Sequence, residues 1–347
     1  MTSDALPATV ARPGGSRTAL AGTALARPAL AGTALARTGA PDFRRCLELA
    51  LAGLWLLDAL LQFQAVMFTT DFARMIEAAA AGNPAFVAGP VRWTAHLIAA
   101  RPLLANGVFA TLQLLIGLGI AWRPARRVAL AASVGWALGV WWLGEGLGGL
   151  LSGATSPVAG LPGPALLYAL VAVLLWPPRP GADAAFPAAG RVGAPAARAA
   201  WIVLWGALAA STEVWPGALG RDVSAAAAGQ PGWLAGTDKA LARLLLDGRS
   251  ATIALAVVLA LVAAGVCWPA AVARVAVLLA IAAGVALWLA QGLGGILAGG
   301  ATDPGSGPLL VLLALSYWPR RAGPQPAAQL DPARTGPASA EAGWWPA

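Results

Sequence analysis

The chain has 347 residues, of which 59% are hydrophobic and only 11% are charged, and its formal net charge is +8. Soluble domains have about a quarter of their residues charged, so this composition argues against a soluble fold and indicates helices that span a lipid bilayer. The positive charge comes almost entirely from arginines between hydrophobic segments, which is typical of membrane topology signals and not of a nucleic-acid-binding surface.

The first 41 residues contain a repeated decapeptide and are predicted to form a disordered cytoplasmic tail, 1–41. The repeat reads TALAGTALAR at 18–27 and PALAGTALAR at 28–37, and its proline and glycine residues interrupt any long helix. A polar stretch at 69–101 is expected to form short amphipathic helices at the membrane surface. The first four predicted spans lie on either side of this stretch, at about 46–68, 103–122, 128–151 and in a segment that ends at 176.

A linker rich in proline, glycine and alanine, 178–198, separates this first unit, 42–177, from a second unit, 199–319. The final segment, 320–347, has a similar composition and is predicted to be a disordered cytoplasmic tail. The second unit contains four further predicted spans, at about 199–215, 251–268, 274–297 and 308–318. The sequence therefore predicts an all-α polytopic membrane protein with eight transmembrane helices.

One motif occurs twice and indicates that the two units are copies of each other. Segment 141–151, WWLGEGLGGLL, matches segment 287–297, LWLAQGLGGIL. Both segments contain a tryptophan, a polar residue three positions later and a G-x-G-G run. This alignment pairs Trp142 with Trp288 and Glu145 with Gln291. Because each predicted unit has an even number of spans, both copies insert the same way up, as two parallel four-helix repeats related by an axis along the membrane normal.

The distribution of basic residues predicts the orientation of the chain. Counting the predicted segments alternately, 16 lysine and arginine residues fall on one side of the membrane and seven on the other. Basic residues in short loops stay on the cytoplasmic side, so both termini are predicted to be cytoplasmic. We expect a multi-pass protein of a bacterial inner membrane, with the lipid bilayer as its first partner.

Glu145 is the most informative candidate for a functional site. At a helical rise of about 1.5 Å per residue it lies about 25 Å along its predicted span, near the outer edge of the hydrocarbon. A carboxylate at that depth is costly, so it either handles a proton or ligand or hydrogen-bonds neighbouring helix ends. Gln291 is its neutral counterpart. Trp141, Trp142 and Trp288 either pack between helices or line a pocket for a flat apolar ligand such as a quinone.

Asp58 is the second candidate, about 18 Å along the first predicted span and so near the bilayer midplane. Gln62 lies one turn further along the same helix face. A midplane aspartate must be protonated, paired or exposed to water, and Gln113 on the second span is its expected partner. These residues either belong to a proton or ligand site or hold the helices together.

The chain offers little for metal binding or hydrolysis. Its two cysteines, Cys46 and Cys267, have no metal-ligand spacing, and His96 is the single histidine. It contains no nucleotide-binding glycine loop and no nucleophile placed beside a base. No metal site is predicted, and any redox cofactor is a quinone or belongs to a partner.

The segment QLLIGLGIAWRPARRVAL at 113–130 resembles the second helix of the DoxX-like family of small four-helix membrane proteins. Residues 251–275 repeat that pattern loosely, and 55–62 resembles the family's first helix. Gln113 stands where the family usually has glutamate. The resemblance implies two fused DoxX-like units, and the family includes the membrane subunit of thiosulfate:quinone oxidoreductase.

Three classes of function remain open. The first is a DoxX-like membrane component of a redox or respiratory system that handles a quinone or anchors an electron-transfer partner. The second is a small-solute or ion transporter or channel with Glu145 and Asp58 in its pathway. The third is a structural accessory subunit of a membrane complex, with other subunits as its partners.

Overall fold

The computed structural model describes residues 42–153, 156–179, 184–214 and 217–320. Within these ranges every regular element is an α-helix or a short 3-10 helix, which confirms the predicted all-α class. The described residues from Arg44 onward belong to one compact unit, and only Asp42 and Phe43 are described of the unit Met1–Phe43. The tails predicted to be disordered, 1–41 and 320–347, lie outside the described residues apart from Arg320.

The helices of the first half follow the order of the predicted segments. They are α2 (Phe43–Leu61), η1 (Ala65–Phe68), α3 (Thr70–Ala78), α4 (Ala85–Ala100), α5 (Pro102–Ala121), α6 (Arg126–Leu143), η2 (Leu147–Gly149) and α7 (Pro164–Leu174). Proline starts both α5 and α7, where its fixed backbone angle suits the first helical turn and its missing N–H is not needed.

The second half shows nearly the same order after the short linker helix α8 (Ala189–Val192). Its elements are α9 (Ala194–Val214), α10 (Ala218–Ala226), α11 (Gly232–Asp247), α12 (Arg249–Gly265), α13 (Ala270–Ala290), η3 (Leu293–Ala298) and α14 (Ser306–Ser316). Helix α9 begins inside the predicted linker 178–198, because Pro195 falls in its first turn, where proline is tolerated.

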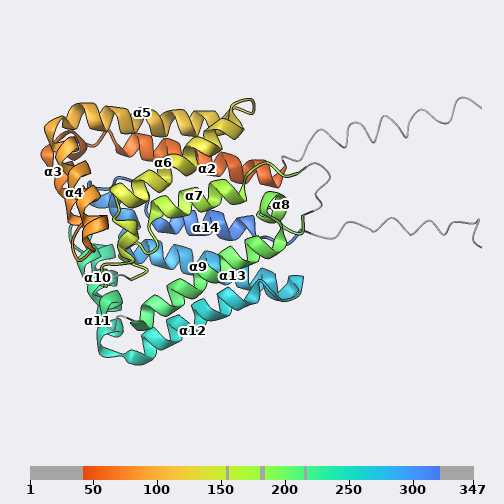
Figure 1. Ribbon diagram of the computed structural model, residues 1–347. Helices are drawn as coiled ribbons and strands as arrows, with labels where there is room; N and C mark the ends of the chain where they lie inside the picture. Colours follow the sequence, from red (N-terminus) through yellow and green to blue (C-terminus); the bar gives the residue numbers. More distant parts are fainter. Residues whose placement is uncertain (1–41, 154–155, 180–183, 215–216, 321–347) are drawn as a thin grey trace, which may run out of the picture. The chain divides into compact units, whose positions relative to one another are not determined.

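Two groups of helices differ in direction (Figure 1). The first group runs lengthwise: α2, α5, α6, α7, α9, α12, α13 and α14. The polar stretches form the second group, α3, α4, α10 and α11, which lies at one end, whereas the α5–α6 turn and α8 lie at the other. Helix α6 packs on α7, α13 packs on α14, and α7 contacts α14, so the two halves meet along these short helices.

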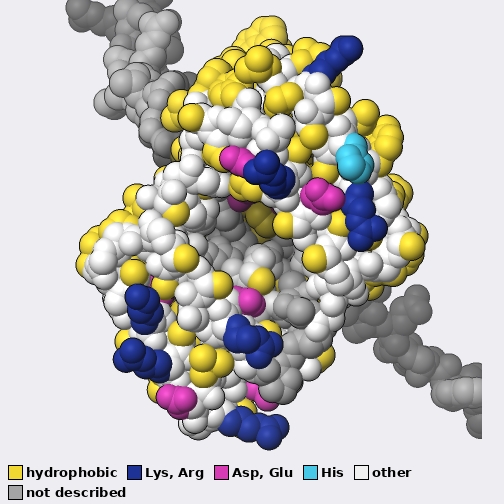
Figure 2. Space-filling model, turned by 90° about the vertical axis from the view of Figure 1, so that its left-hand side faces the viewer, with side chains coloured by type: hydrophobic (Ala, Val, Ile, Leu, Met, Phe, Trp, Pro, Cys, Tyr) yellow, Lys and Arg dark blue, Asp and Glu magenta, His cyan; other side chains and the backbone are white. Residues whose placement is uncertain are grey.

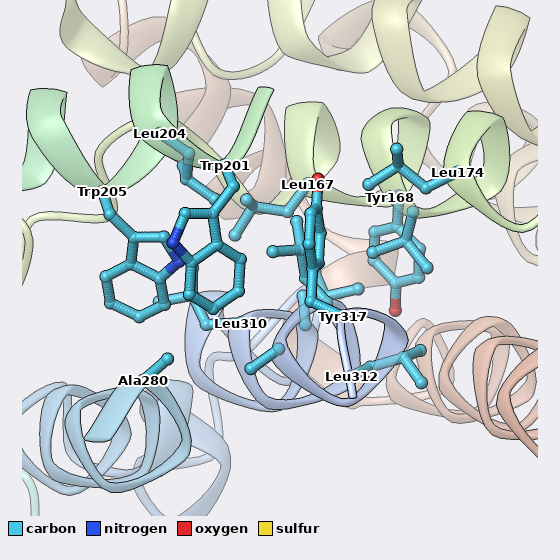
Figure 3. Packing of buried hydrophobic residues seen from close by; sticks show 14 of the residues in the cluster. Leu167, Tyr168, Leu174, Trp201, Leu204, Trp205, Ala280, Leu310, Leu312 and Tyr317 are labelled. Carbon is cyan, nitrogen blue, oxygen red and sulfur yellow. The ribbon is translucent and has the colours of Figure 1, made fainter. Parts of the chain in front are cut away.

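A single large cluster of buried apolar side chains runs through both halves. Figure 3 shows its middle, where Tyr168 of α7, Trp201 and Trp205 of α9 and Leu310 of α14 meet beside Tyr317. The Tyr317 ring lies 4.7 Å from that of Trp201, and its hydroxyl donates to Ala197 O at 2.5 Å. Large aromatic rings thus fill the junction between the halves, and those of Trp201 and Tyr317 also form hydrogen bonds there.

Helices α5 and α6 approach each other closely at one glycine, and α12 and α13 do so at the equivalent glycine of the second half. A Cβ atom added to Gly119 would lie 2.7 Å from Ala129 Cβ, and one added to Gly265 would lie 2.5 Å from Ala276 Cβ. Glycine opposite alanine is what such a close crossing of two helices requires. These matched contacts support the pairing of α5–α6 with α12–α13.

A buried carboxylate fastens the end of the molecule that holds the α5–α6 turn. Glu48 of α2 is fully buried, and its Oε2 accepts from Arg45 Nη1 and from Arg126 Nη1, both at 2.9 Å. The Arg44 Nε atom lies 3.7 Å from Glu48 Oε1, and Arg44 Nη1 donates to Pro187 O at 2.6 Å. One glutamate thus joins α2 to α6 and, through Arg44, to the linker.

Three described helical segments are long and apolar enough to cross a membrane: α5, α9 and the segment Ala270–Ala298, which contains α13 and η3. Helices α11 and α12, which meet at an angle of 99°, would make a fourth if taken as one broken span. Helix α2 carries four charged residues, and α7 and α14 are shorter apolar helices. The chain is therefore a helical protein with candidate membrane spans, and the eight predicted spans stay a prediction.

The outer faces of the lengthwise helices are apolar, as bilayer contact requires. Leu115 and Leu118 of α5, Leu261 of α12 and Val275 of α13 are exposed although the helices around them are packed. Charged residues are instead visible around a central hollow at the end formed by α3, α4, α10 and α11 (Figure 2). Exposed apolar side chains in such numbers mark a surface that contacts lipid or protein.

Candidate functional site

Glu145 lies in a turn beyond the end of a helix. The predicted span 128–151 continues past it, but α6 ends at Leu143, because the following motif takes up the left-handed backbone conformation. Gly146, Leu147 and Gly148 have φ angles of 56°, 59° and 61°. A Cβ atom on Gly148 would clash with Pro162 O, so glycine is needed for both backbone angle and space.

The turn after α13 has the same conformation. Gly292, Leu293 and Gly294 have φ angles of 64°, 57° and 69°, and a Cβ atom on Gly294 would clash with Pro304 O. An L-residue such as leucine rarely adopts a positive φ, and here both copies do so at the same position. The repeated motif is thus a repeated backbone turn.

The tryptophan that matches Trp288 in space is Trp141, not Trp142 as the sequence pairing suggested. Trp141 Nε1 donates to Pro162 O at 2.7 Å, and Trp288 Nε1 donates to Pro304 O at the same distance. The register differs because Glu145 N bonds to a carbonyl five residues back, whereas Gln291 N bonds to one four residues back. Trp142 is instead exposed.

Glu145 and Gln291 occupy equivalent turns but have different partners. The Gln291 amide is satisfied at both ends, since Nε2 donates to Ser306 Oγ at 2.8 Å and to Pro157 O at 3.1 Å while Oε1 lies 3.2 Å from Ser306 Oγ. Glu145 Oε1 accepts from Ala165 N at 3.0 Å, but Oε2 is buried and has no hydrogen-bond partner among the described residues. Gln291 therefore serves the structure, and Glu145 keeps an unused acceptor.

Glu145 lines a cavity of about 480 Å³ in the first half. Its walls come from α2, α3, α4, α5, α6 and α7, and the loop before α14 adds Thr302 and Asp303 from the second half. Aromatic side chains form much of the wall: Trp55, Phe72, Trp93, Phe109, Trp136 and Tyr168. This volume and mixture are typical of a small-molecule site.

The cavity brings together four of the predicted residues and leaves out the other four. Its polar lining includes Asp58, Gln62, Gln113 and Glu145. The residues that do not line it are Gln291, Trp141, Trp142 and Trp288. The second copy of the motif thus supports the fold, and the candidate site lies in the first half.

Asp58 is almost completely buried and accepts a hydrogen bond from the hydroxyl of Tyr168 at 2.8 Å. The Tyr168 ring lies 4.2 Å from that of Trp55. Gln113, the expected partner of Asp58, lines the same cavity, but its Oε1 is buried without a partner in the described part of the chain. The structure therefore supplies a tyrosine where the sequence predicted a glutamine.

Asp303 is a site residue that the sequence reasoning missed. Its Oδ1 accepts from Gly305 N at 2.7 Å and its Oδ2 lies 3.0 Å from Thr302 Oγ1. These two hydrogen bonds hold the Asp303 carboxyl in the wall of the cavity. The Thr-Asp-Pro sequence beside the second motif was the available signal, because the first copy has no acid there.

Three carboxyl groups, those of Asp58, Glu145 and Asp303, line the cavity without a lysine, arginine or histidine beside them among the lining residues. No three potential metal ligands of the His, Cys, Asp or Glu type lie together in the part of the chain that the structure describes. A second hollow, of about 370 Å³ and rich in glycine, shares Glu145 with the cavity.

No protein-family model matches the chain, and neither a curated protein nor a solved structure shows significant similarity to it.

Proposed function

We propose that the protein is a polytopic membrane protein that binds a small, largely apolar solute in the cavity of its first half, as a transporter or channel with Asp58 and Glu145 in its pathway. The observation that carries the proposal is the polar lining of this cavity. Gln62 Oε1, Gln113 Oε1 and Glu145 Oε2 are buried there without partners among the described residues. Buried polar atoms are nearly always hydrogen-bonded, so unpaired ones around a cavity indicate a missing ligand.

We further propose eight spans in two parallel repeats in a bacterial inner membrane, with both termini cytoplasmic. The matched order of helices supports this topology, as do the arginines at the α5–α6 turn. Helices α7 and α14 have 11 residues each and reach only about 17 Å at 1.5 Å per residue. The loops before them would complete each crossing, as non-helical backbone can where protein surrounds it.

A second candidate function is the handling of a quinone by a DoxX-like component of a redox system, alone or with a partner subunit. It is favoured by the aromatic wall and by Trp136 Nε1, which is buried and unpartnered among the described residues. A quinone ring is flat and has carbonyl acceptors for such a donor. The chain would hold the quinone, and any further redox group would belong to the partner.

Two glycines of α6 allow a matched test of the cavity. An added Cβ atom meets nothing within 4 Å at either Gly139, which lines the cavity, or Gly135, which is exposed and does not line it. Gly139→Leu therefore fills the cavity, and Gly135→Leu is the control with the same gain in helix propensity. Binding of 4-phenylbutanol, 4-phenylbutylammonium and decylubiquinone is measured for each purified full-length protein in mild detergent.

We expect at least one probe to bind the wild-type protein and Gly135→Leu equally, and Gly139→Leu at least about tenfold more weakly, since lost contacts of about 1.4 kcal/mol suffice. Tightest binding of decylubiquinone would favour the redox candidate. If no probe distinguishes Gly139→Leu from Gly135→Leu, the cavity is not a binding site and the proposal is wrong.

A further inference from the structure

The hydrogen-bonding groups left free in the cavity are mainly acceptors. Gln62 Nε2 lies 3.4 Å from Thr302 O, which orients the amide and leaves Oε1 without a partner among the described residues. Glu145 Oε2 is likewise free, since Oε1 takes the Ala165 N–H. Gln62 is 3% exposed, so water reaches it poorly. A ligand that satisfies these atoms must bring N–H or O–H donors.

The charged groups around the cavity are all acidic. Asp303 is close enough to interact electrostatically with both Asp58 and Glu145. Arg92 and Arg101, which could have neutralised Glu145, do not line the cavity, and no described cation forms a salt bridge with Glu145. Carboxyl groups removed from water are stabilised by an opposite charge, and here the ligand would have to supply it.

Aromatic rings form a continuous wall beside these acids. Phe109 contacts Phe72 edge-on at 6.0 Å and Trp136 at 5.2 Å between ring centres. Trp93 also lines the cavity and is 60% exposed, so it stands where the cavity meets the exterior. Aromatic faces attract ammonium groups as well as apolar bodies.

We infer that the ligand of this cavity is an amphipathic organic cation, a protonated amine on an aromatic or aliphatic body; this inference rests on the proposed function and names its substrate class. The ammonium N–H groups satisfy unpaired acceptors of the lining such as Glu145 Oε2, and its single positive charge offsets part of the acidic charge of the cavity. The apolar body lies against the aromatic wall. A quinone adds further acceptors to a lining that already has unpaired acceptors, and an anion is repelled.

A matched pair of probes separates charge from shape. 4-Phenylbutylammonium and 4-phenylbutanol have the same carbon skeleton, and their dissociation constants are compared by calorimetry on the full-length protein in mild detergent at pH 8. We expect the ammonium to bind about tenfold more tightly, as charge-assisted hydrogen bonds exceed neutral ones by such amounts. The preference should fall to about twofold or less in Glu145→Gln, while the affinity for the alcohol stays unchanged.

Glu77→Gln is the control, because Glu77 is an exposed acid on α3 that does not line the cavity. It should keep the full preference for the ammonium. If Glu145→Gln does not fold, Asp58→Asn carries the same test. Equal binding of the two probes to the wild-type protein overturns the inference but leaves the cavity as a binding site. A preference for the ammonium that is unchanged in Glu145→Gln and in Asp58→Asn also overturns it, because these acids then do not recognise the charge.

Discussion

Replacing Glu48 by glutamine should destabilise the protein by about 3 kcal/mol, since breaking a buried ion pair by removing one partner costs about 3–5 kcal/mol. Glu48 is fully buried, and the side chains of Arg44 and Arg45 are only 6% and 11% exposed. Glutamine preserves the shape and one acceptor oxygen but leaves these guanidinium groups without their counter-charge. The lower end of the range applies because Arg126, at 28% exposed, can turn toward water.

The assay is thermal unfolding in detergent at one fixed scan rate, followed by circular dichroism at 222 nm. Glu77→Gln, a substitution at an exposed position, should lie within about 0.5 kcal/mol of the wild-type protein. The deficit of Glu48→Gln should change little between low and high salt, because buried pairs are poorly screened. A Glu48→Gln protein as stable as Glu77→Gln would refute the view that this cluster fastens α2 to its neighbours.

Trp141→Phe and Trp288→Phe remove equivalent hydrogen bonds and should each cost about 1–3 kcal/mol in thermal unfolding; a large difference between them would contradict the structural match. Cysteines introduced near Asn83 should react with an impermeant reagent added to intact cells, whereas those near Arg126 should not. Labelling near Arg126 would contradict the predicted orientation of the chain.

The sequence was sufficient to predict the helical class and the repeated motif, because both are local features, but the predicted spans 128–151 and 274–297 ran through the turns that the motif forms. Apolar runs of helical length produce α5 and α13, and the G-x-G-G runs allow the left-handed turns that follow α6 and α13. The difference between Glu145 and Gln291 was also visible in the sequence. Their partners were not, because Ala165 and Ser306 stand at equivalent turns only after the loops have folded.

The rest of the candidate site depends on contacts between distant parts of the chain. Asp303 enters the cavity of the first half only because the loop before α14 crosses from the second half. Tyr168 reaches Asp58 because of how α7 is rotated against α2, and no periodicity in either helix specifies that rotation. The matching of Trp141 with Trp288 depends on one wider turn of backbone, which the sequence alignment of two tryptophans could not reveal.

The central claim is that the two copies of the motif have separate roles, Glu145 in ligand binding and Gln291 in stability. It is tested most directly by measuring thermal unfolding and 4-phenylbutylammonium binding on the same preparations of Glu145→Gln and Gln291→Leu. Glu145→Gln should unfold like the wild-type protein, since the equivalent turn already accepts glutamine, and should bind the probe at least about fivefold more weakly. Gln291→Leu should lose about 1–3 kcal/mol of stability with its hydrogen bonds and still bind the probe. Wild-type binding by Glu145→Gln, or loss of binding by a folded Gln291→Leu protein, would contradict the account.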